Sequence, residues 1–224
     1  GDLDPNISLA TQIGLAVLFS LGVHKPGGKI TDFLKQIADK DATLIVTGHS
    51  LGGALSPSLA LALFNPGPKA LNRGDWNEVL VYPTAGPTPG DEHFARLFSQ
   101  QFPPGNTAAA QPYGTWNNLI WNSLDAVPHA WQSKTLLKIP FLYRVRGVEL
   151  IIGGLALETA IAYVVSRLNV NGYTQLSNVP LSGTQQTDPI TTAGDWFKEL
   201  AYQHVDAYAD LTGTREGYEL LLGL

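Results

Sequence analysis

Cysteine is absent from the 224-residue chain, and its absence excludes several kinds of chemistry. Without thiols the protein cannot form disulfide bonds, bind a metal ion through thiolates or use a cysteine as its nucleophile. Cytoplasmic and secreted proteins can both lack cysteine, so the absence leaves the localisation unknown. Nucleophilic chemistry in this protein has to use another type of side chain.

Positive charge is also scarce. The chain has 14 Lys and Arg against 19 Asp and Glu, a formal net charge of −5, and no run of basic residues. Because nucleic-acid binding needs a basic stripe that neutralises phosphates, we expect no nucleic-acid partner. The five histidines show no H-x₃-H spacing, so we also expect no metal ion and no organic cofactor.

Apolar runs are too short to cross a membrane. The longest one, LIIGGLALETAIAYVV at residues 150–165, is interrupted by Glu158. Neither half approaches the ~20 apolar residues that a transmembrane helix needs, so we predict a buried or interfacial helix and no transmembrane segment. The chain length and the 44% hydrophobic content suit one domain over residues 1–224 with a substantial core.

Hydrophobic periodicity predicts an alternation of helices and strands. Helices are expected at residues 7–22, 30–40, 51–64, 90–102, 147–168 and 195–213. Strands are expected at residues 42–48, 78–84 and 117–123, with an ambiguous segment at 131–143 and a loop at 180–195. Strands that alternate with helices favour an α/β fold with a mostly parallel sheet.

The segment LIVTGHSLGGAL, at residues 44–55, carries the strongest functional signal. A buried strand ends in the sequence GHSLG, which fits the pattern G-x-S-x-G, and a helix follows. The serine of such a strand-to-helix turn holds a strained backbone, and the glycines two residues before and after it let backbone approach closely. The turn therefore predicts Ser50 as an exposed nucleophile and the Leu51 N–H as an oxyanion donor at a helix N-terminus.

With its flanking residues, TGHSLGGAL resembles the same turn in the class 3 lipases, the fungal-type triacylglycerol lipases of the α/β-hydrolase fold. YPTAGPTPGDEHFARLF, at residues 82–98, is similar to the family's next strand, Gly-Pro loop and helix. NSLDAVPHAW, at residues 122–131, is similar to the segment that carries the catalytic aspartate. The resemblance covers most of residues 7–131 and implies an α/β-hydrolase-like, mostly parallel sheet flanked by helices.

A serine nucleophile needs an imidazole that accepts its proton, and the imidazole needs a carboxylate that orients it. The order along the chain in this fold is serine, acid, histidine. Asp125 lies in the Asp-x-Val-Pro match just after a predicted strand, so we assign it the acid role; a helix-capping or turn role is the alternative. The weaker candidates for the acid are Asp188, Asp195 and Asp206.

Five histidines compete for the role of base. His49 adjoins the nucleophile and must point elsewhere. His24 and His93 precede the acid in the chain, and His129 follows it by only four residues, too close for both to reach the serine. His204 remains, in AYQHVDAYADL, which resembles the family's late histidine followed four residues on by a tyrosine. The alternative for His204 is a histidine on a helix surface.

Two features of the family have no counterpart in the 49 residues before Ser50. In class 3 lipases the second oxyanion donor follows an upstream strand with an Arg-Gly-Thr-like signature, and the lid usually follows that strand. We therefore expect a sheet that lacks the family's N-terminal strands and has an open edge. Loss of one oxyanion donor typically lowers turnover by ~10²–10³.

The resemblance and the candidate residues together predict a serine hydrolase of carboxylic esters. We expect a lipase or esterase that acts on acylglycerols through an acyl-enzyme on Ser50, with a lipid or ester small molecule as substrate and a lipid–water interface as a candidate partner. Residues 147–168 and 173–194 are candidates for a wall or cover of the site; core packing and a surface loop are the alternatives. Two other functions stay open, a weakly active or non-catalytic module of the lipase fold and an acyltransferase with the same triad.

Overall fold

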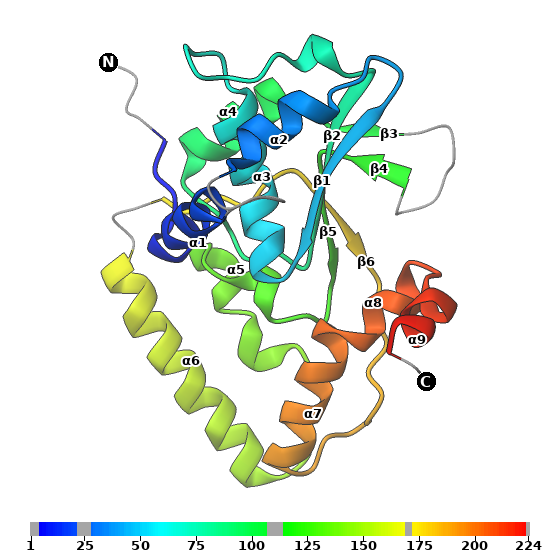
Figure 1. The fold of residues 1–224 in the computed structure, drawn as a ribbon. Helices are drawn as coiled ribbons and strands as arrows, with labels where there is room; N and C mark the ends of the chain where they lie inside the picture. Colours follow the sequence, from blue (N-terminus) through cyan, green and yellow to red (C-terminus); the bar gives the residue numbers. More distant parts are fainter. Residues whose placement is uncertain (1–4, 22–27, 107–113, 169–171, 223–224) are drawn as a thin grey trace.

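The computed structural model describes residues 5–21, 28–106, 114–168 and 172–222 (Figure 1). Its main sheet has four parallel strands in the order β1–β2–β5–β6. These strands are β1 (Thr43–His49), β2 (Glu78–Thr84), β5 (Leu119–Asn122) and β6 (Asn178–Leu181). A short antiparallel pair, β3 (Gly105–Asn106) and β4 (Thr115–Trp116), lies beside it. The mostly parallel α/β architecture is therefore confirmed.

Helices precede, connect and follow the strands. They are α1 (Leu9–Ser20), α2 (Ile30–Ile37), α3 (Leu51–Phe64), α4 (Glu92–Gln101), α5 (Ser133–Leu136), α6 (Val148–Leu168), α7 (Ala193–His204), α8 (Asp206–Leu211) and α9 (Arg215–Leu222). Short 3₁₀ turns cover residues 73–75, 127–129 and 139–141. The helices predicted at 51–64 and 147–168 match α3 and α6 to within one residue.

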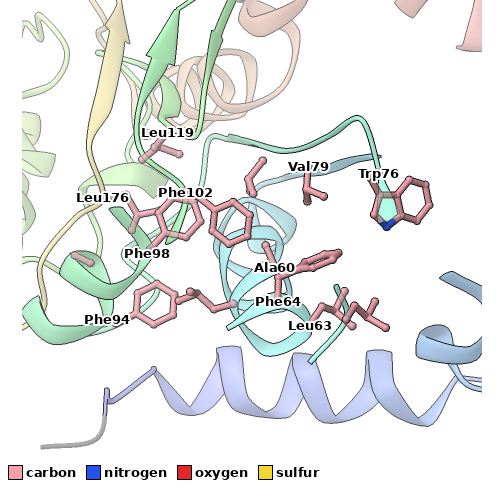
Figure 2. Packing of buried hydrophobic residues seen from close by; sticks show 14 of the residues in the cluster. Ala60, Leu63, Phe64, Trp76, Val79, Phe94, Phe98, Phe102, Leu119 and Leu176 are labelled. Carbon is pink, nitrogen blue, oxygen red and sulfur yellow. The ribbon is translucent and has the colours of Figure 1, made fainter. Parts of the chain in front are cut away.

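The core lies between the sheet and helices α3 and α4 (Figure 2). Val79 and Val81 of β2 enter it, and Leu44 and Val46 of β1 pack against it. Helix α3 supplies buried side chains at several positions, and α4 adds aromatic rings. The labelled members in Figure 2 are Ala60, Leu63, Phe64, Trp76, Val79, Phe94, Phe98, Phe102, Leu119 and Leu176. This packing holds the C-terminal half of α3 against β1 and β2.

Strand β1 is the edge of the sheet within the described residues, as expected for a sheet with an open edge. Its residues alternate between two faces, because successive side chains of a strand point to opposite sides. Ile45, Thr47 and His49 are exposed on the face away from α3 and line a hollow of about 760 Å³ against α8. Parallel sheets usually bury both faces, so this half of the sheet is unusually open.

The C-terminal third differs from the prediction in three places. The helix expected at 195–213 is two helices, because the backbone leaves the helical path at Val205, with φ −119° and ψ −71°. The loop expected at 180–195 begins inside β6, where Pro180 is tolerated because β6 pairs on one side only. Helix α9 was not predicted.

Helix α6 is exposed, so of the two alternatives predicted for it, a buried helix or an interfacial helix, the buried one is wrong. Ile152 is 59% exposed and Leu155 is 52% exposed. The helix runs along the periphery of the molecule and contacts α5 and the 3₁₀ turn at residues 139–141 (Figure 1). Among the described residues, no helix combines the length and apolar character that crossing a membrane requires.

Candidate active site

Ser50 lies at the sharp turn between β1 and α3. Its φ of 59° and ψ of −123° belong to a region that residues with a side chain rarely adopt. Backbone hydrogen bonds hold the turn: the Ser50 N–H donates to the Thr84 carbonyl at 3.1 Å, and the Gly53 N–H donates to the Ser50 carbonyl at 2.8 Å. The strained strand-to-helix turn predicted from GHSLG is therefore present.

The glycines around Ser50 differ from the expectation in one respect. A Cβ atom on Gly48 would lie 2.4 Å from the carbonyl oxygen of Gly52, so Gly48 permits the close approach that the pattern predicts. A Cβ atom on Gly52 would meet nothing within 4 Å, so the role assigned to that position was wrong. Gly53 takes that role instead, because its Cβ would lie 2.3 Å from the Thr84 carbonyl oxygen and 2.7 Å from the Gly86 backbone.

Three side chains from distant parts of the chain form one hydrogen-bonded row. His204 Nε2 is 2.9 Å from Ser50 Oγ, and His204 Nδ1 is 2.9 and 3.0 Å from the two carboxylate oxygens of Asp125. A carboxylate only accepts hydrogen bonds, so Nδ1 carries the ring proton and Nε2 of the neutral ring accepts the Ser50 hydroxyl proton. Ser50 follows β1, Asp125 follows β5 and His204 ends α7.

Asp125 is fully buried and makes two further hydrogen bonds. The Val127 N–H donates to its Oδ1 at 3.0 Å, and the Tyr208 hydroxyl donates to its Oδ2 at 2.8 Å. The same hydroxyl accepts the Asn122 N–H at 2.9 Å. Burial, and then the Asp125 carboxylate, raise the pKa of Tyr208, so the phenol keeps its proton and remains a donor. Sequence reasoning noted this tyrosine only as part of the resemblance.

A buried polar network holds the end of α7 against the end of β5. The Asn122 amide donates to the Gln203 backbone carbonyl at 2.9 Å and to its side-chain oxygen at 2.6 Å. Gln203 donates in turn to Glu199 at 2.7 Å, and the Glu199 carboxylate accepts the N–H groups of Gln186 and Thr187. Since Gln203 precedes His204, the network fixes the backbone that carries the imidazole. No sequence signal had marked these residues.

The other histidines that the structure describes lie outside the hydrogen-bonded row. His129 Nδ1 donates to the backbone carbonyl of Asp125 at 2.8 Å, and burial lowers the pKa of its ring. His49 Nε2 donates to the backbone carbonyl of His204 at 2.8 Å. His93 lies in α4, and His24 falls outside the described residues. Only His204 therefore lies between a serine and a carboxylate in the described part of the chain.

The three weaker acid candidates lie elsewhere. Asp188 pairs with Arg144 at 2.8 Å on the surface. Asp195 lies in the first turn of α7, where its carboxylate accepts the hydroxyl of the N-cap residue Thr192 at 2.7 Å. Asp206 opens α8. The arrangement brings only Asp125 to His204 Nδ1.

Leu51 is the first residue of α3, directly after Ser50. The first N–H groups of a helix have no partner within the helix and carry the positive end of its dipole. The Leu51 N–H is therefore available for an anion beside the Ser50 hydroxyl. Its role as an oxyanion donor stays a prediction.

A second hollow lies between α6 and α7, with a volume of about 660 Å³. Its lining is mostly apolar and includes Val148, Leu157, Trp196 and Phe197. Trp196 precedes His204 by eight residues of helix α7, which corresponds to ~12 Å along the axis. The hollow and the hydrogen-bonded row thus share helix α7, with Trp196 at the hollow and His204 in the row.

Comparisons with known proteins show the family and the fold to which the chain is similar. A family model described as Lipase (class 3) matches residues 18–135, just over half of the chain. No curated protein sequence matches the chain. The solved structure of M37 lipase is similar with a TM-score of 0.74 and 29% identity, over 96% of this chain and 61% of that one. The chain therefore spans less than two thirds of the length of that lipase.

Two fungal lipases show weaker similarity. The lipase from Rhizopus microsporus var. chinensis has a TM-score of 0.42 and 20% identity, over 59% of this chain and 39% of that one. The Rhizomucor miehei lipase propeptide complex has a TM-score of 0.38 and 21% identity, over 57% and 34%.

Proposed function

The chain belongs to the class 3 lipase family, and from this premise we propose that it hydrolyses carboxylic esters, with acylglycerols as its substrate class. The observation that carries the proposal is the row Ser50–His204–Asp125, in which both hydrogen-bonded contacts are 2.9 Å long. A hydroxyl, an imidazole and a carboxylate in this order can generate a nucleophile at neutral pH. The similarity to M37 lipase over 96% of the chain supports the same conclusion.

The first half of the proposed reaction acylates Ser50. Its Oγ attacks the ester carbonyl carbon while His204 Nε2 takes the hydroxyl proton. The negative charge that forms on the carbonyl oxygen is stabilised by the Leu51 N–H at the start of α3. When the C–O bond to the alcohol breaks, His204 returns the proton to the leaving alcohol. The products of this half are a free alcohol and an acyl-enzyme on Ser50.

The second half releases the acid. Water attacks the acyl carbon as His204 Nε2 takes one of its protons, and the Ser50 oxygen leaves and regains a proton from the imidazolium. Asp125 orients the imidazole and stabilises its positive charge throughout. Because Asp125 is fully buried and receives hydrogen bonds from Val127 and Tyr208, its carboxylate stays in one orientation. No step requires a metal ion or an organic cofactor.

An apolar acyl chain suits the surroundings of the row. The hollow between α6 and α7 has a mostly apolar lining that includes Val148, Leu157, Trp196 and Phe197, and Glu149 is its one charged residue among those that the structure describes. In this proposal α6 forms one wall of the chain-binding region. Esters with medium or long acyl chains are therefore the expected substrates, and hydrolysis of nitrophenyl esters of increasing chain length tests this preference.

The nucleophile is tested by labelling the purified protein with a fluorophosphonate. We expect labelling that is lost in Ser50→Ala and in His204→Ala but retained in His129→Ala, because the His129 ring donates to the backbone carbonyl of Asp125 and packs edge-on against Trp121, away from the row itself. Ester hydrolysis should follow the same pattern. Labelling that persists in Ser50→Ala would refute the assignment of the nucleophile.

The alternative function is a non-catalytic module of the lipase fold. The observation that favours it is the open edge of β1 within the described residues, together with a single candidate for the oxyanion donor. A protein of this kind would bind no fluorophosphonate at Ser50 and would release no nitrophenol above the background rate. The same experiment therefore separates the two functions.

A further inference from the structure

His49, which precedes Ser50 in the chain, contacts the histidine of the hydrogen-bonded row. It is the last residue of β1, and its ring lies on the open face with Ile45 and Thr47. His49 Nε2 is 2.8 Å from the backbone carbonyl oxygen of His204, and the two ring centroids are 5.0 Å apart. His204 is therefore held at two points, with Asp125 on its ring and His49 on its backbone.

The contact determines which nitrogen of His49 carries the proton. A carbonyl oxygen only accepts hydrogen bonds, so Nε2 of His49 must be the donor. Nδ1 of the neutral ring then lacks a proton and faces the Thr84 hydroxyl at 3.3 Å. Partial burial of the ring, and then the proximity of His204, lower the pKa of His49, which favours this neutral form. The neutral form avoids a second positive charge beside the imidazolium that His204 becomes during the proposed reaction.

The backbone that His49 contacts is a place where the chain needs support. His204 is the last residue of α7, and the helical path breaks at Val205 before α8 begins. The last four carbonyls of a helix have no donor within the helix, so an outside donor stabilises them. His49 supplies one such donor, from a residue adjacent to Ser50. The two residues that share the reacting proton are thus linked through His49 as well as through their own side chains.

We propose that His49 is a positioning residue for the reaction, because its Nε2–H holds the His204 carbonyl and so keeps the imidazole within hydrogen-bonding distance of Ser50. The inference rests on the proposed ester hydrolysis. His49 does not contact the reacting atoms in this arrangement, so its loss should lower kcat and leave KM nearly unchanged. Displacement of a catalytic group by about 1 Å can lower the rate by about 10²-fold, so a partial displacement should be easily measurable.

Two amide substitutions test the contact with matched chemistry. In His49→Gln the amide nitrogen reaches the position of the imidazole Nε2, whereas in His49→Asn it reaches only the position of Nδ1. We expect His49→Asn to lower kcat by about 10-fold with KM within about twofold, in line with the loss of one hydrogen bond. His49→Gln should recover most of this loss. Equal activity of the two variants would overturn the proposal, since both carry the same functional group.

Fluorophosphonate labelling separates failure of this inference from failure of the proposed function. If the wild-type protein is not labelled at Ser50, both fail together. If the wild-type protein is labelled and His49→Asn reacts at the same rate, only the role of His49 fails. The expected result is labelling that is slower in His49→Asn than in His49→Gln.

A measurement on the wild-type protein avoids any dependence on variant folding. In protein labelled with ¹⁵N-histidine, the nitrogen chemical shifts report the tautomer of each ring, and the His49 signals are assigned by their loss in His49→Gln. We expect a proton on Nε2 of His49 and none on Nδ1 at neutral pH. A proton on Nδ1 alone would overturn the proposal, because Nε2 could not then donate to His204.

Discussion

The hydroxyl of Tyr208 offers the sharpest test of how the row is held together. It donates to Asp125 Oδ2 at 2.8 Å and accepts the Asn122 N–H at 2.9 Å. Asp125 and Asn122 are both fully buried, so water cannot replace the hydroxyl. The substitution Tyr208→Phe removes this one oxygen atom and keeps the ring that packs edge-on against His49.

The expected loss of stability follows from the two contacts. A hydrogen bond to a charged group contributes about 1.5–3 kcal/mol, and a buried N–H left without an acceptor costs about 1–3 kcal/mol. The same hydroxyl serves both groups, so the two contributions overlap, and we expect a total of about 3 kcal/mol. For a chain of this length, 1 kcal/mol corresponds to about 2–4 °C, so Tm should fall by about 6–12 °C.

Urea denaturation of matched variants measures this loss. The control is Tyr202→Phe, which makes the same chemical change where the Tyr202 hydroxyl donates to Asp210 at 3.0 Å on the surface. The control should lose about 0.5 kcal/mol or less, as surface substitutions usually do. The midpoint for Tyr208→Phe should fall with little change in the m-value. Equal losses in the two variants would refute the view that Tyr208 supports a buried carboxylate.

Two further predictions concern close packing and pH. Gly53→Ala should destabilise the fold by about 2–3 kcal/mol, because its Cβ would lie 2.3 Å from the Thr84 carbonyl oxygen. Gly52→Ala should be neutral or stabilising by up to about 1 kcal/mol, because a Cβ there meets nothing within 4 Å. Denaturation curves that rank the two variants the other way would contradict this prediction. Burial lowers the pKa of the His129 ring from its ordinary value of 6.5. Below about pH 6.5 the unfolded chain therefore binds more protons at this residue than the folded protein does. The free energy of unfolding should fall as the pH drops toward the pKa of the folded state. His129→Phe should flatten this decrease in thermal midpoint between about pH 6.5 and 5, and an unchanged slope would argue against a buried neutral ring.

The strand-to-helix turn could be predicted from the sequence because its requirements are local. Backbone strain at Ser50 and the close approach at Gly48 depend on a few consecutive residues. The sequence assigned the second close approach of backbone to Gly52, and this assignment was wrong. The position that needs a glycine is Gly53, because the backbone of Thr84 and Gly86 crowds it. Those residues belong to the next strand and loop, whose approach to α3 no local pattern encodes.

The C-terminal third was harder to predict for related reasons. The periodicity of residues 195–213 is helical throughout, yet the chain turns at Val205, and the first helix ends at His204, beside Asp125. The sequence also left open whether α6 is buried or interfacial, because an apolar composition does not reveal whether a neighbouring element is available to cover it. In both cases the outcome depends on contacts between distant segments.

The sequence by itself determined the fold class, the strained turn at Ser50 and a short set of candidate acids and bases, because strand and helix periods, glycine positions and chain order are properties of neighbouring residues. Only the tertiary structure decided that Asp125 and His204 meet Ser50, and that Tyr208, Gln203 and His49 hold them from three sides. Hydrogen bonds between residues that lie about 80 to 155 positions apart form only after the sheet and helices have packed. Their geometry therefore depends on the whole arrangement of the chain.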